Sequence, residues 1–225
     1  MTETPGVPET PTGPPEGTQP PAPPPPPPPP TSVGPAADYP VRLDIDHQAE
    51  YSRFMPLVKW LLAIPHYIAL AVLYIVGFFA VIVAFFAVIF TGRYPPGLFN
   101  FLVGVGRWHN RVYAYLFLMV DPYPPFSLDD DPSYPVRFDV EYPEQGVDRW
   151  RPILAWLLVL PFAIVASILI YLAEILVFFA FFTILFTRKF PEGMYKIVLI
   201  ALRWEARAGA YTLWMTTRYP PFVWD

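Results

Sequence analysis

Two short polar elements recur in apolar stretches of the sequence, and they hold its most suggestive chemistry. The first consists of Arg107, Trp108 and Arg111, and the second of Arg203, Trp204 and Arg207. Residues three or four apart share one face of a helix, so each element would present two guanidiniums beside an indole. Such a face could bind a lipid headgroup or another anion. The simpler alternative is anchoring, with the indole at the headgroups and the guanidiniums on lipid phosphates.

Glu174 is an ionisable residue inside the apolar stretch of residues 153–186. An ionisable group at membrane depth is costly, so its presence there is a functional hypothesis by default. The simpler alternative is an ion pair with an arginine of the two polar elements. We therefore take Glu174, together with those arginines and tryptophans, as a candidate for a polar seam or for headgroup contacts.

The histidines do not form a recognisable catalytic or metal-binding pattern. There are three, His47, His66 and His109, and Phe162 and Glu205 stand at the positions of the last two in the second half of the chain. Their spacing does not fit a zinc site, and neither a nucleophile elbow nor a phosphate-binding loop is present. The chain has no cysteine. We therefore expect no catalytic residue, cofactor or metal, and no enzymatic activity.

Composition favours lipid as the partner. Of 225 residues, 54% are hydrophobic and 15% are charged, whereas soluble proteins carry about 25% charged residues. The net charge of −4 argues against a nucleic-acid partner, because phosphate binding normally needs a basic patch. We therefore expect a protein of the membrane.

Residues 1–38 differ from the rest of the chain, because they are rich in proline, threonine and glycine and contain no lysine or arginine. Such a composition predicts a disordered tail. The run Pro23–Pro30 would adopt an extended polyproline helix, either as a spacer or as a ligand for the aromatic groove of a protein partner. The tail lacks the features of a signal peptide, so the first membrane segment would have to provide targeting.

The remainder consists of two copies of one unit, which we place at residues 39–129 and 130–225. YPVRLDID at 39–46 returns as YPVRFDVE at 134–141, and from Arg53 onward the copies align at a constant offset of 96 residues. The alternation of Val41, Leu43 and Ile45 with polar residues predicts a short strand at the membrane surface in each unit.

A long apolar block follows each strand, at 57–90 and 153–186. A straight helix of that length would measure about 50 Å, which exceeds the hydrocarbon core of about 30 Å. Pro65 and Pro161 should kink these helices, leaving an interfacial start before the proline and a crossing after it. Trp60 and Trp156 lie in these starts, as interfacial residues would.

A second helix, at about 98–119 in the first unit, carries the arginine stripe. It could cross the membrane or lie in the interface. Because the two YPVR segments share a sequence, they should share an environment, which favours an even number of crossings per unit. We therefore predict an all-α membrane protein of two tandem helical hairpins with about four membrane helices. In it, the arginines would face the bundle interior and pair with Glu174, Glu205 or backbone carbonyls.

Orientation follows from the basic residues near the membrane. Six arginines lie on the side of the termini, against three basic residues at the turns between helices. The positive-inside rule then places both termini in the cytoplasm of a multi-pass protein of the cell membrane.

The YPVR segments, the Trp–Pro start of the long helix, FTGRYPPG, the Arg-Trp-x-x-Arg element and the closing YPPF resemble a bacterial membrane family known as domain of unknown function 4389. The resemblance covers residues 39–225 and implies tandem membrane units without an established activity. We expect a non-enzymatic scaffold or accessory membrane component. The alternative is a small transporter, or a lipid- or anion-binding protein, that uses the Arg-Trp-x-x-Arg helices. The oligomeric state stays open.

Overall fold

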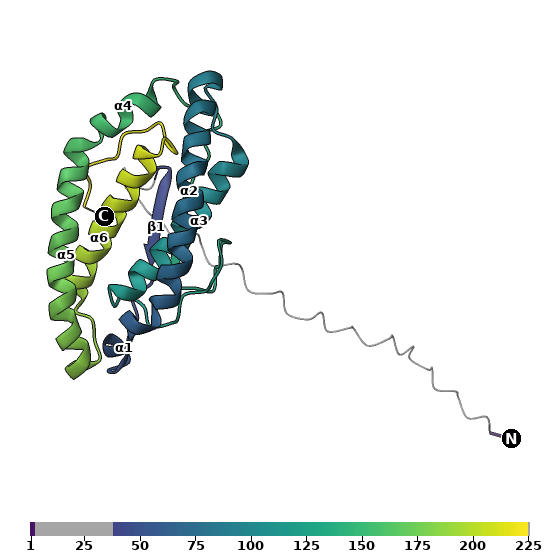
Figure 1. The fold of residues 1–225 in the computed structure, drawn as a ribbon. Coiled ribbons are helices and arrows are strands. Elements are labelled where there is room, and N and C mark those ends of the chain that lie inside the picture. The colour runs from purple at the N-terminus through teal and green to yellow at the C-terminus, as the bar shows by residue number, and fades with distance from the viewer. Residues whose placement is uncertain (3–37, 225) are drawn as a thin grey trace. The chain divides into compact units, whose positions relative to one another are not determined.

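A computed structural model describes residues 1–2 and 38–224. The predicted tail and its polyproline run therefore lie almost wholly outside the described residues. Within the described residues, the elements follow in this order (Figure 1): β1 (Val41–Ile45), α1 (Met55–Leu62), α2 (Ile64–Thr91), α3 (Pro96–Leu116), β2 (Val136–Val140), α4 (Arg151–Leu158), α5 (Leu160–Thr187) and α6 (Glu192–Thr212).

The two predicted strands are present, but they form one sheet instead of two separate surface segments. β1 and β2 pair antiparallel, with Leu43 opposite Phe138 at the centre. In each strand the alternate apolar residues are buried. The strands therefore bury one face against the helices and leave the other, charged face outward.

The predicted interruption of the long helices is confirmed. The helix breaks at Ala63 in the first unit and at Val159 in the second, each two residues before a proline. Proline lacks the N–H that a continuous helix needs, and its ring clashes with the preceding turn. α2 and α5 then run for 28 residues each and end at left-handed residues, Gly92 and Arg188, with φ of 71° and 61°.

Two stretches of the described residues, rather than about four, are long and apolar enough to cross a membrane. They are Met55–Thr91 and Leu160–Thr187. Helices α3 and α6 do not qualify, because the arginines and other polar residues of the repeated stripe lower their hydropathy. Only 22% of the apolar window of each stretch is buried, whereas a core helix of a soluble protein is mostly buried.

The two units run antiparallel. The N–H of Tyr51, just before α1, donates to the carbonyl of Arg188 at the end of α5, at 2.9 Å. The corresponding bond joins the N–H of Val147 to the carbonyl of Gly92 at the end of α2, at 2.8 Å. Each unit thus begins beside the end of the other unit's long helix, as Figure 1 shows for α1 and α5. A pseudo-twofold axis passes between Leu43 and Phe138.

The strands are exchanged between the units. β1 packs against α6 of the second unit, whereas β2 packs against α3 of the first. Their apolar faces join α3 and α6 in one core, and α2 and α5 cover the far side of that core. The order of layers is therefore sheet, then α3 and α6, then α2 and α5.

Candidate polar site on the arginine helices

Arg107 and Arg203 bind the exchanged strands in equivalent ways. Arg107 donates from Nε to the carbonyl of Phe138, at 3.1 Å, and from Nη2 to Asp139 Oδ1, at 2.6 Å. Arg203 donates to the carbonyl of Leu43 and to Asp44 Oδ1, both at 2.8 Å. The backbone carbonyls match the sequence prediction, but the acidic partners are strand aspartates instead of Glu174 or Glu205.

The second arginine of each element lies against the tyrosine that precedes an exchanged strand. The Arg111 guanidinium lies 5.9 Å from the Tyr134 ring centre, and that of Arg207 lies 5.8 Å from the Tyr39 ring centre. Arg111 also donates to the carbonyl of Asp129, at 2.7 Å. Both arginines are almost fully buried, at 1% and 4% exposed. They therefore stabilise the strand ends from within the fold.

Tyr39 and Tyr134 complete this arrangement through their hydroxyls. Tyr39 donates to the carbonyl of Arg218, at 3.2 Å, and Tyr134 to that of Pro122, at 3.0 Å. Burial raises the pKa of both hydroxyls well above their usual value, so both stay protonated and can donate. Each strand is thus fixed by an aspartate, by a backbone carbonyl and by the tyrosine before it.

The two tryptophans of the elements are core residues. Trp108 is 7% exposed and donates from Nε1 to His66 Nδ1, at 3.0 Å. Trp204 is 1% exposed, donates to the carbonyl of Val223, at 2.9 Å, and stacks on Phe162, with ring centres 4.5 Å apart. Phe162 occupies the place of His66 in the second unit. Neither indole is free to reach lipid headgroups.

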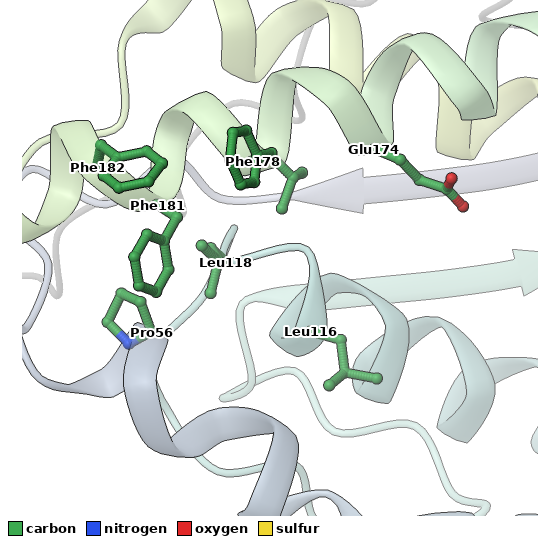
Figure 2. A pocket seen from close by; sticks show the side chains of 8 residues that line it. Pro56, Leu116, Leu118, Glu174, Phe178, Phe181 and Phe182 are labelled. Atoms are coloured by element: carbon green, nitrogen blue, oxygen red, sulfur yellow. The ribbon is translucent and has the colours of Figure 1, made fainter.

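Glu174 of α5 is part of a pocket of about 390 Å³ whose other walls are apolar (Figure 2). Leu116, the last residue of α3, and Leu118, just after it, lie across the pocket from α5, which supplies Phe178 and Phe181. Pro56, at the start of α1, closes one end. The pocket therefore joins one carboxylate to an aromatic, lipid-like lining.

Two polar contacts were missed by the sequence analysis. Lys59 is 2% exposed, and its Nζ lies 2.8 Å from both the Val120 carbonyl and Asp121 Oδ1. The Tyr74 hydroxyl lies 2.7 Å from His109 Nδ1. Lys59 was a detectable signal, because it is a charged residue within an apolar block. Its partner was not detectable, because 61 residues separate it from Val120.

Comparison with known proteins agrees with the repeat. No curated protein and no solved structure matches the chain significantly. One family does match, in two tandem copies, each starting after the strand and covering the helical part of a unit. Together the two matches cover most of the described helices. The chain therefore belongs to the family described as Domain of unknown function (DUF4389), whose sequence model matches residues 56–127 and 149–223.

Proposed function

We propose that this protein is inserted in a membrane and serves there as a non-enzymatic scaffold or accessory component. Insertion is supported by the exposed side chains of α1, α2, α4 and α5, most of which are large and apolar. Leaving such a surface in water would be unfavourable, since soluble monomers rarely expose large contiguous apolar patches. In a bilayer this surface would be out of contact with water, and its apolar side chains would lose no hydrogen bonds.

A structural role for the arginine helices is supported by one observation, the equivalent binding of Arg107 and Arg203 to the exchanged strands. Their guanidiniums donate to Phe138 and Asp139 in one case and to Leu43 and Asp44 in the other. An arginine that binds a transported anion or a lipid phosphate needs its donors available to that ligand. Because these N–H groups are already bonded within the fold, a stabilising role for the two arginines is favoured over ligand binding.

Proteoliposomes distinguish this proposal from a transporter. We expect vesicles containing the full chain to release chloride or phosphate no faster than empty vesicles. In addition, Arg203→Ala should lower the unfolding temperature without changing that release. Faster release by the wild type that Arg203→Ala abolishes at an unchanged unfolding temperature would overturn the proposal. Lys196→Ala, on the same helix but in an exposed pair with Glu192, is the matched control.

The proline-rich tail is proposed to contact a protein partner. Affinity purification of the full chain and of a variant lacking residues 1–37 should differ in the proteins recovered. If both variants recover the same proteins, the tail does not contribute to the scaffold role. Any partner would then have to bind the membrane-inserted part of the chain. Membrane extraction of both variants with carbonate controls for insertion.

A further inference from the structure

The apolar and the charged surfaces of this protein lie on opposite faces. On one face, the exposed residues of α2 and α5 are almost entirely apolar and include Ile68, Phe79, Ile168 and Phe179. On the other face, the sheet points charged side chains outward. Asp44, Asp46 and Asp139 keep 56%, 58% and 64% of their side-chain surface exposed. The fold is therefore apolar on the side of α2 and α5 and charged on the side of the sheet.

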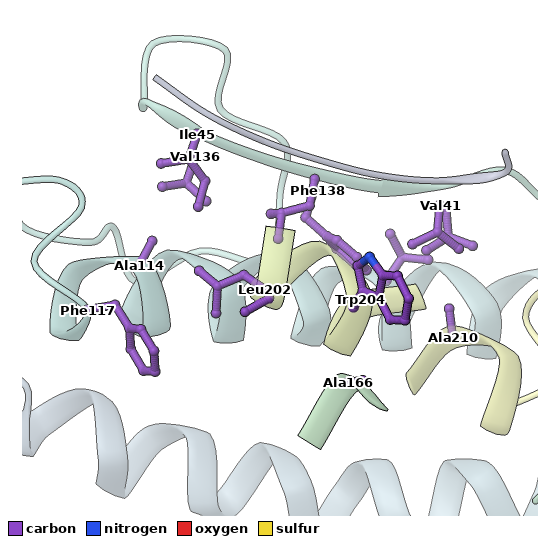
Figure 3. Close-up of a cluster of buried hydrophobic side chains, with 14 of the residues drawn as sticks. Val41, Ile45, Ala114, Phe117, Val136, Phe138, Ala166, Leu202, Trp204 and Ala210 are labelled. Atoms are coloured by element: carbon purple, nitrogen blue, oxygen red, sulfur yellow. The ribbon is translucent and has the colours of Figure 1, made fainter. Parts of the chain in front are cut away.

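The charged sheet lies alongside the middle of the long helices and not beyond their ends. Tyr74, near the centre of α2, bonds to His109 of α3, and a Cβ added at Gly77 would lie 3.6 Å from Leu102 Cδ2 of α3. Phe138, at the centre of β2, accepts a hydrogen bond from Arg107 of the same part of α3. In Figure 3, the labelled side chains of both strands point toward the helix layers, which lie below the sheet.

The connection between the units also runs along the length of the helices. It leaves α3 after residue 116, and Val147 is bound to Gly92 at the opposite end of α2. On its way Asp129 accepts a hydrogen bond from Arg111 near the end of α3, and Leu128 lies against Gly104 near the middle of that helix. This segment is largely non-helical, and it carries Asp129 and Asp130 exposed.

These placements are incompatible with long helices that cross a bilayer as a monomer. In that orientation the sheet and Asp130 would lie at the depth of the hydrocarbon. Exposed non-helical backbone does not occur there, and exposed charges are strongly unfavourable. The antiparallel units would also be inverted relative to each other, although they repeat the same sequence motifs.

We propose that the protein lies along one leaflet, with the axes of α2 and α5 parallel to the membrane plane. Lipid hydrocarbon then contacts α1, α2, α4 and α5, and the charged face of the sheet lies in water or among headgroups. The pseudo-twofold axis stands normal to the membrane, so both units occupy the same environment. This inference rests on the proposed membrane insertion and departs from the multi-pass arrangement expected from the sequence.

The absence of native cysteine makes a direct test possible. Two variants, Ser52→Cys and Lys189→Cys, place a cysteine at the end of the protein where α1 begins and α5 ends. Two others, Arg93→Cys and Glu144→Cys, place one at the opposite end, after α2 and before α4. All four positions are exposed. Each full-length variant is reacted with a membrane-impermeant maleimide in right-side-out and in inside-out vesicles. Carbonate extraction first confirms that each variant is embedded.

The in-plane arrangement predicts that all four cysteines react from the same side of the membrane. Reaction of the two ends from opposite sides would overturn it, while leaving insertion intact. Extraction of the protein by carbonate would instead contradict the proposed insertion itself. Polarised infrared dichroism of aligned bilayers gives a second measurement. Helix axes parallel to the membrane plane are expected, and axes near the membrane normal would overturn the proposal.

Discussion

Arg203 donates a hydrogen bond to Asp44, a residue that precedes it by 159 positions and belongs to the other unit. The bond measures 2.8 Å, and the equivalent pair, Arg107 and Asp139, is separated by only 32 positions. The same local chemistry therefore serves two different purposes. In the first unit it holds a strand that follows directly, and in the second it ties the two ends of the described chain together.

Arg203→Ala should destabilise the protein by about 1.5–3 kcal/mol, because a hydrogen bond from a charged donor to the Leu43 carbonyl is lost along with the ion pair. Asp44→Ala should cost less than about 1 kcal/mol, because that carboxylate is largely exposed and Arg203 keeps the carbonyl. Chemical unfolding in detergent micelles, followed by circular dichroism, measures both. Equal losses would contradict the role given to the carbonyl.

Asp121→Ala should destabilise the protein by about 3–5 kcal/mol, because it leaves the buried Lys59 ammonium without its counter-charge. The second unit has Ala155 and Thr217 at these positions. The double variant Lys59→Ala/Asp121→Thr reproduces that pair and should recover part of the loss. The same unfolding assay applies, and a double variant less stable than Asp121→Ala would refute the assignment.

Gly104→Ala should destabilise the protein by about 1–3 kcal/mol through overpacking. An added Cβ would lie 2.9 Å from the Leu128 Cβ and 3.0 Å from the Leu128 carbonyl oxygen, so the backbone of the connection must move. Gly97→Ala is the control on the same helix, because an added Cβ there meets nothing within 4 Å. It should be neutral or stabilising by up to about 1 kcal/mol.

Stability should fall in acid partly through Asp46. Arg137 donates two hydrogen bonds to this carboxylate, at 2.9 and 2.6 Å, and they hold the pKa of Asp46 below its ordinary value. A lowered pKa stabilises the fold above the ordinary value, near 4, and that contribution is lost as pH falls through the lowered one. Because the carboxylate is 58% exposed, the contribution should stay under about 1 kcal/mol.

Asp46→Asn tests this contribution. Unfolding temperatures measured between neutral pH and about pH 3 should fall less steeply for the variant than for the wild type. Arg137→Gln should flatten the same part of the curve, because it removes the partner that lowers the pKa. An unchanged slope in both variants would exclude Asp46 as a source of the acid sensitivity.

Local features of the fold were predictable because each depends on a short segment. The alternation of Val41, Leu43 and Ile45 predicted the first strand, and Pro65 predicted the break before α2. Both follow from rules that act within a few residues, namely the period of a strand and the missing N–H of proline. The repeat then extended these predictions to the second unit.

The pairing between segments was not predictable in the same way. No periodic pattern specifies that β1 pairs with β2, or that the units run antiparallel, because these are contacts between distant parts of the chain. One feature of the sequence nevertheless indicates the acidic partners of the arginines. Asp44 and Asp139 occupy the same place in the two repeats, so a shared role with Arg107 and Arg203 could have been considered.

The exchange of strands also sets an order in which the protein can be completed during synthesis. β1 leaves the ribosome first, yet α6, the helix it packs against, is made last. The first unit can close around β2 soon after translation of that strand, whereas β1 must wait until α6 has been made. A circular permutation that moves residues 39–53 behind Trp224 would make each unit continuous, and should shorten that wait.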